Sequence, residues 1–190
     1  MDAMNVAIHR RAMTRQDFLT WVENQEGRWE FDGLQPVAMT GGTNNHGRIS
    51  GNLYFALRRR LGGACEAMTA EAGGVATVGN KVRYPDVTVT CSPVTGSDRL
   101  IPEPVLLFEV VSDSSARDDH GDKRIEYQTI PSVLRYVVVE QDREEVTVFH
   151  RSGSGAWLTF RLGGGDVLDM PEVGIEIPVS EMYERVTFGT

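Results

Sequence analysis

Residues 105–111 of this 190-residue chain read Val105-Leu106-Leu107-Phe108-Glu109-Val110-Val111, its most hydrophobic run. An unbroken run of aliphatic and β-branched residues is typical of a strand buried on both faces, so it predicts the centre of a sheet. The run contains one glutamate, Glu109. An ionised carboxylate in such a strand costs several kcal/mol unless a partner or a metal ion compensates it. This stretch therefore decides the fold and also points to a functional residue.

The rest of the pattern predicts one α/β (α+β) domain over residues 14–190, after a flexible N-terminal tail at residues 1–13. The expected helices cover residues 14–26, 46–61, 119–129 and 180–183. The expected strands cover residues 28–31, 34–39, 65–70, 74–78, 86–91, 105–111, 135–140, 145–151, 157–162 and 175–179. Asp32-Gly33 indicates a two-residue hairpin turn. We expect a mixed central sheet flanked by helices and ending in a C-terminal β-meander.

The composition limits the class of function. No apolar stretch approaches the length of a membrane span, and the N-terminus lacks the apolar centre of a signal peptide, so a cytoplasmic protein is expected. A net charge of −8 argues against coating nucleic acid through bulk charge, but not against a nuclease, because a bound divalent ion offsets carboxylates locally. The two cysteines, Cys65 and Cys91, are expected to be reduced thiols rather than a disulfide. They form no structural zinc pattern.

The basic residues are distributed unevenly. Seventeen are arginine and only Lys81 and Lys123 are lysine. Arginine cannot lose its proton at useful pH, whereas a partly buried lysine can. The distribution singles out both lysines, although for Lys81 alone a tolerant surface position is favoured.

Three residues at predicted strand and helix ends suggest a metal-dependent phosphodiesterase. Asp86 and Glu109 can lie side by side if their strands pair, and with the carbonyl of Val110 they offer hard oxygen ligands for Mg²⁺ or Mn²⁺. Lys123 could then orient or deprotonate the attacking water. The alternative is that Asp86 only shapes a turn and Glu109 pairs with an arginine such as Arg135. The shared metal site is the favoured interpretation.

Other residues are possible additions to this cleft. Glu30 is as consistent with an extra cleft carboxylate as with a solvent-facing strand position. His46 could contact a phosphate or a bound water, but a helix-start histidine with no ligand role is favoured. Asp119 is interpreted as a helix cap or a partner of Lys123. Tyr127 is expected to pack rather than to take part in chemistry, and Arg58-Arg59-Arg60 to form a solvated helix face.

These motifs together resemble the Uma-type family of restriction-endonuclease-like proteins, within the PD-(D/E)XK nuclease superfamily. The resemblance spans residues 13–179. It is carried by Pro85-Asp86, Glu109-Val110-Val111-Ser112, Asp119, Lys123 and Tyr127, with support from Trp29-Glu30-Phe31-Asp32-Gly33, His46 and Arg135-Tyr136-Val137-Val138-Val139. It implies a restriction-endonuclease-like fold and a metal-dependent endonuclease that hydrolyses DNA.

Two positions depart from the superfamily pattern. Val111 stands where the superfamily has lysine, and the resemblance implies that Lys123 takes its place. Ser112-Asp113-Ser114-Ser115 replaces a more usual Ser-Pro-Ser-Thr turn. The alternative function is a catalytically weak or inactive nucleic-acid-binding or interaction module. A homodimer is expected, because two sites related by a two-fold axis can cut both strands of a duplex. Its candidate surface is formed by Val146, Val148, Trp157 and Phe160, on strands that are expected to lack a covering layer.

Overall fold

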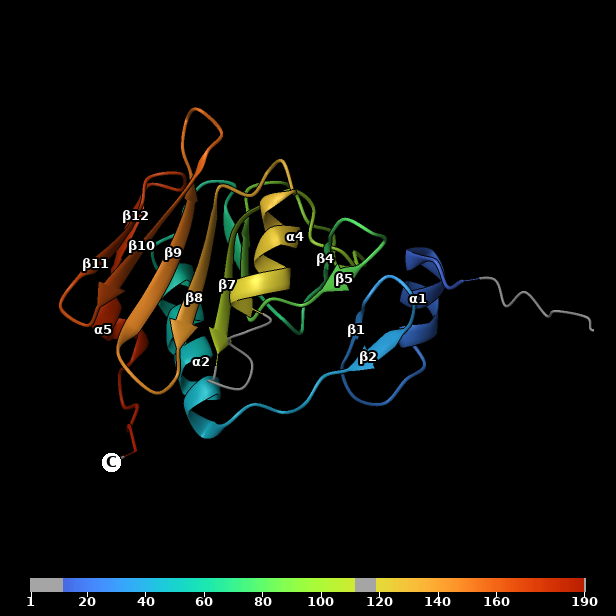
Figure 1. The fold of residues 1–190 in the computed structure, drawn as a ribbon, viewed down its shortest axis with the longest axis horizontal. Coiled ribbons are helices and arrows are strands. Elements are labelled where there is room, and N and C mark those ends of the chain that lie inside the picture. The colour runs from blue at the N-terminus through green and yellow to red at the C-terminus, as the bar shows by residue number, and fades with distance from the viewer. Residues whose placement is uncertain (1–11, 112–118, 190) are drawn as a thin grey trace, which may run out of the picture.

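The computed structural model describes residues 12–111 and 119–189, with the side chains of residues 119 and 120 excepted (Figure 1). The helical elements are α1 (Arg15–Val22), α2 (Asn44–Arg58), the π-turn η1 (Asp119–Lys123), α4 (Arg124–Gln128) and α5 (Val179–Met182). The strands are β1 (Trp29–Phe31), β2 (Pro36–Ala38), β3 (Glu66–Thr69), β4 (Val75–Ala76), β5 (Val82–Arg83), β6 (Val87–Thr90), β7 (Pro104–Val111), β8 (Arg135–Glu140), β9 (Glu145–Arg151), β10 (Trp157–Gly163), β11 (Val167–Met170) and β12 (Ile175–Pro178).

A six-stranded sheet with the order β10-β9-β8-β7-β6-β3 forms the centre of the molecule. Strand β7 pairs antiparallel with β6 and parallel with β8, so the sheet is mixed, as predicted. Alternate residues of β7 face opposite sides. Phe108 packs in the cluster that includes α2, while Leu107 and Val111 pack in the cluster that includes Tyr127 of α4. Figure 1 shows α2 behind the sheet and α4 in front of it.

A smaller sheet with the order β2-β1-β5-β4 lies beside the central sheet and is covered by α1 (Figure 1). Its hairpin joins Phe31 to Pro36, so the loop has four residues and the predicted two-residue turn is wrong. The reason is local. Asp32 Oδ1 accepts the backbone N–H groups of Leu34 and Gln35, each at 2.7 Å, which winds the chain into an Asx turn before β2 can begin.

Most predicted elements are confirmed within one or two residues of their ends. The helices predicted to reach residues 26 and 61 end earlier, at Val22 and Arg58, and two short strands escaped prediction. Strands β5 and β11 were not expected. Helix α2 begins at Asn44, because Thr43 Oγ1 accepts the backbone N–H of His46 and caps it. Met13, assigned to the tail, is partly buried beside the α1 cluster, and its carbonyl accepts a hydrogen bond from Asn80; residues 1–11 lie outside the described part. No helix in the described ranges is long and apolar enough to span a membrane.

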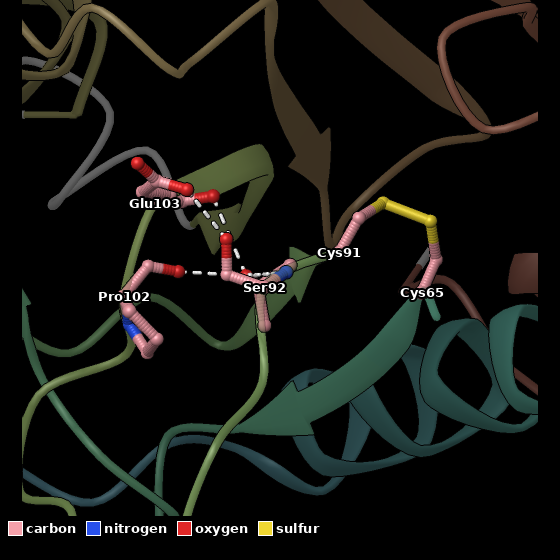
Figure 2. Close-up of a disulfide and its surroundings, with 6 residues drawn as sticks. Cys65, Cys91, Ser92, Pro102 and Glu103 are labelled. Atoms are coloured by element: carbon pink, nitrogen blue, oxygen red, sulfur yellow. Dashed lines mark hydrogen bonds between the residues drawn. A yellow bond between two sulfur atoms is a disulfide. The ribbon is translucent and has the colours of Figure 1, made fainter. Parts of the chain in front are cut away.

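The expectation of reduced thiols is wrong, because Cys65 and Cys91 form a disulfide (Figure 2). Strands β3 and β6 pair antiparallel with Glu66 opposite Thr90, so the next pair outward is Cys65 and Cys91. The sequence separation of 26 residues did not reveal that β3 and β6 are neighbours. Figure 2 also shows Ser92, directly after Cys91, whose hydroxyl donates a hydrogen bond to the carboxylate of Glu103.

Half of the surface predicted for dimer formation is internal. Val146 and Val148 are fully buried, because β11, β12 and α5 cover that face of β9 through Leu168, Ile177 and Met182. The expectation that these strands lack a covering layer is therefore wrong. Phe160 on β10 is 40% exposed, as is the neighbouring apolar residue Leu158 at 53%. The homodimer itself stays a prediction.

Candidate active site

The start of β6 and the end of β7 bring Asp86 and Glu109 to one edge of the central sheet. Val87 lies opposite Phe108, so Asp86 precedes its strand beside Glu109. Asp86 Oδ2 accepts the backbone N–H of Val110 at 2.7 Å, which fixes the aspartate against β7. The prediction that the two strands are neighbours and that both carboxylates line one cleft is confirmed.

The cleft has a volume of about 550 Å³. It is lined by β2 and the segment that leads into α2, residues 37–43, by Asp86 and Glu109 at the strand ends, and by Lys123 at the end of η1. The ionisable side chains that line it are Arg28, Glu30, His46, Tyr84, Asp86, Glu109 and Lys123. The sequence named Asp86, Glu109 and Lys123 as site residues, and Glu30 and His46 as possible additions to the cleft.

Glu109 is 5% exposed, and its Oε1 has two donors. Lys123 Nζ lies 3.2 Å away and the hydroxyl of Tyr127 donates at 2.8 Å. Burial, and then the charge of Glu109, raises the pKa of Tyr127 well above its ordinary value, so this hydroxyl keeps its proton and continues to donate. The alternative, in which Glu109 pairs with Arg135, is wrong, because Arg135 pairs with Glu172 at 2.8 Å. Tyr127, expected only to pack, also holds the central carboxylate.

Lys123 reaches the cleft because η1 and α4 cross over the end of β7. Its Nζ lies 3.2 Å from Glu109 and 3.5 Å from Glu30. Val111, at the superfamily's lysine position, is fully buried in the cluster with Tyr127 and Tyr136. A lysine at 111 would have to replace an apolar core residue, whereas Lys123 approaches the same carboxylate from the covering helix. The expected closeness of Lys123 and Glu109 is confirmed.

Glu30 and His46 both belong to the cleft. Glu30 is 8% exposed and accepts from Arg83 Nη1 at 3.0 Å and from the backbone N–H of Tyr84 at 3.4 Å, so a solvent-facing position is excluded. His46 Nε2 lies 3.2 Å from Asp86 Oδ1, although the sequence favoured a histidine without a ligand role. A Cβ at Gly42 would lie 2.7 Å from the His46 ring, so a larger residue at this position would clash with the ring.

Two site predictions fall on residues that the structure does not fully describe. The backbone of Asp119 begins η1, and its side chain lies outside the described part of the chain. The turn Ser112-Asp113-Ser114-Ser115 lies outside it as well. The sequence also missed a neighbouring cluster, in which Lys81 and Arg83 both bind Glu126. The scarcity of lysine was the one signal that pointed there.

The donor set fits a hard divalent cation with few protein ligands. In the described part of the chain no group of three His, Cys, Asp or Glu side chains is placed to hold a metal ion. Asp86 and Glu109 supply two carboxylates, and Val110 also lines the cleft. Mg²⁺ usually keeps several waters and binds through one or two carboxylates plus substrate phosphates, so two carboxylates suffice for it. Glu30 is bound by Arg83 and lies outside this pair.

The mixed sheet, the covering helices and the strand-end carboxylates define a restriction-endonuclease-like protein. The Uma2 family model, described as "Putative restriction endonuclease", matches residues 15–180, and the chain belongs to this family. Two uncharacterized Synechocystis proteins are similar to it. The first, slr1290, is 30% identical over 178 residues, 93% of this chain and 94% of that protein. The second, sll1609, is 26% identical over 165 residues, 85% of this chain and 93% of that protein.

A solved structure shares the fold. It is the crystal structure of a "putative nuclease belonging to DUF820" from Anabaena variabilis, with a TM-score of 0.70 that covers 92% of this chain and 99% of that one. The identity is 12%, so this likeness shows the architecture alone.

Proposed function

We propose that this protein is a metal-dependent endonuclease that hydrolyses phosphodiester bonds of DNA. The observation that carries the proposal is the meeting of Asp86, Glu109 and Lys123 in one cleft, although they come from three separate segments of the chain. Membership of a family described as restriction endonucleases supports the same class of substrate.

Each residue has a chemical role in this proposal. Asp86, Glu109 and the carbonyl of Val110 would hold Mg²⁺ or Mn²⁺, which when bound offsets the charge that develops on the phosphate. His46 holds one oxygen of Asp86, and Tyr127 holds one oxygen of Glu109, so both carboxylates are oriented. Lys123 orients the attacking water or accepts its proton.

The test is cleavage of supercoiled plasmid in Mg²⁺ or Mn²⁺. We expect the wild type to convert the plasmid to nicked or linear forms and Glu109→Gln to leave it intact, because the amide removes a charged ligand. Glu181→Gln is the control, since Glu181 binds Arg59 and Arg60 away from the cleft. Equal cleavage by the wild type and Glu109→Gln would refute the proposed site.

A catalytically weak nucleic-acid-binding module is the second candidate. The buried Val111 favours it, because the superfamily's lysine position cannot contribute a charge. Calorimetry with Mn²⁺, followed by DNA binding at a stated salt concentration, separates the two candidates. Metal and DNA binding without cleavage would identify the binding module, whereas cleavage that requires Asp86 would identify the enzyme.

A homodimer and a cytoplasmic location complete the proposal. Two sites related by a two-fold axis suit the cutting of both strands, and a monomer by light scattering at micromolar concentration would count against the dimer. The Cys65–Cys91 disulfide argues against the cytoplasmic part of this proposal, because such bonds are rare in a reducing compartment.

A further inference from the structure

Glu126, a buried carboxylate on α4, binds Lys81, the lysine of this chain that lies outside the cleft. Glu126 is 4% exposed. Its Oε1 accepts from Lys81 Nζ at 2.6 Å and from Arg83 Nη2 at 2.8 Å, and its Oε2 accepts from Arg83 Nε at 2.8 Å and from the hydroxyl of Thr77 at 3.1 Å. This cluster lies outside the residues that line the cleft. Both oxygens of Glu126 are therefore satisfied by donors from β5 and the segment around it.

Helix α4 depends on such contacts for its position. It has five residues and no side-chain cap at its start, and a helix this short has little stability of its own. Lys123, Glu126 and Tyr127 are spaced i, i+3 and i+4, so they lie on one face, while Ile125 is 55% exposed. Tyr127 attaches that face to Glu109, and Glu126 attaches it to β5.

Arg83 connects this attachment to the other carboxylate beside Lys123. Its guanidinium donates a bidentate pair of hydrogen bonds to Glu126 through Nε and Nη2. The third nitrogen, Nη1, donates to Glu30 at 3.0 Å. The Arg83 side chain is 13% exposed, so solvent screens these pairs little. Hydrogen bonding to Glu126 comes first among the causes that raise the pKa of Arg83. The Arg83 side chain thus orients both Glu30, which contacts Lys123, and helix α4, which begins directly after Lys123.

We propose that Glu126 is a positioning residue for Lys123, and that Lys81 and Arg83 act through it. The two lysines of the chain would then serve one purpose: Lys123 works in the cleft and Lys81 helps to hold the helix that presents it. The catalytic meaning of this placement rests on the proposed endonuclease function. The placement itself does not, and it is measured without DNA or metal.

The experiment uses the rarity of lysine. With two lysines in the chain, an amine-reactive reagent such as trinitrobenzenesulfonate can be followed at each position by peptide mass spectrometry. The Lys123 side chain is 17% exposed in the folded protein. We expect Glu126→Gln to raise the labelling rate of Lys123 severalfold, because the amide no longer holds α4 against two cations. The matched control is Glu181→Gln, which also removes a carboxylate bound by two cations, but on α5.

Arg83→Lys tests the same link if Glu126→Gln fails to fold. Lysine keeps the positive charge but cannot form the bidentate pair of hydrogen bonds with Glu126, so Lys123 labelling should also rise. Circular dichroism reports whether the fold persists. If the wild type cuts DNA, the two variants should lose activity through a lower kcat more than through a higher KM, since Asp86 and Glu109 are unchanged. Lys123 labelled at the wild-type rate in a folded Glu126→Gln or Arg83→Lys protein would overturn the proposal. A wild-type enzyme that fails to cut DNA would refute the proposed function and leave this test intact.

Discussion

Glu109 illustrates how one residue serves a buried strand and a reactive cleft. It lies among fully buried apolar neighbours, yet Lys123 and Tyr127 reach its Oε1 at 3.2 and 2.8 Å. These contacts offset part of the cost of burying the charge, which would otherwise disfavour the strand. The amine that compensates Glu109 is also the group proposed to act on water.

Lys123→Arg separates charge from proton transfer at this position. Arginine keeps the positive charge and most of the reach, but its guanidinium cannot accept a proton at neutral pH. We expect Mn²⁺ binding measured by calorimetry to persist and plasmid cleavage to fall by about 100-fold or more. Asp86→Asn should lose both metal binding and cleavage.

The outcome depends on which role Lys123 has. If Lys123→Arg cuts plasmid as fast as the wild type, Lys123 is not a general base. Lys123→Met then tests the remaining electrostatic role, because it removes the charge and keeps much of the side-chain volume.

At the scale of elements, the site is assembled from short pieces held by ion pairs. Strand β5 has two residues and α4 has five, yet Arg83 and Glu126 join them. Burial acts to raise the pKa of Glu126, but hydrogen bonds from Arg83 and Lys81, with their charges, lower it to about 2 from an ordinary 4.5. The ionised carboxylate is therefore the form that stabilises this junction.

The stability of the fold should depend on pH through Glu126. Because its pKa is lower in the folded state, its contribution is complete above pH 4.5 and is lost as the pH falls towards 2. The full contribution is on the order of 3 kcal/mol. Urea unfolding should show Glu126→Gln less stable than the wild type at pH 6, with a smaller difference at pH 3.5. A difference that is the same at both pH values would contradict the assigned role of the charge.

At the scale of the whole molecule, the disulfide ties edge strand β3 to its neighbour β6. Cross-linking residues 26 positions apart restricts the unfolded chain, which by loop length alone corresponds to about 3.5 kcal/mol. We expect a reductant to lower the free energy of unfolding, measured in urea, by up to that amount. A Cys65→Ser and Cys91→Ser double variant should be insensitive to reductant. A wild type with the same stability in both conditions would show that the bond adds nothing.

The sequence by itself determined the central strand, its neighbours, the long helix and the C-terminal meander, because each has a clear pattern of apolar residues, unbroken in the central strand and periodic in the long helix. It also identified Asp86, Glu109 and Lys123 as a group, which the structure brings together in one cleft. The composition singled out Lys81 without showing its partner.

Only the tertiary structure decided the contacts between distant segments. The Cys65–Cys91 bond requires β3 and β6 to be adjacent, the His46–Asp86 pair requires α2 to begin at the sheet edge, and Glu126 requires β5 to pass under α4. Such contacts depend on how elements pack against one another, and local periodicity carries no information about residues dozens of positions apart. The fold class was therefore readable from the chain, whereas the network that supports the site was not.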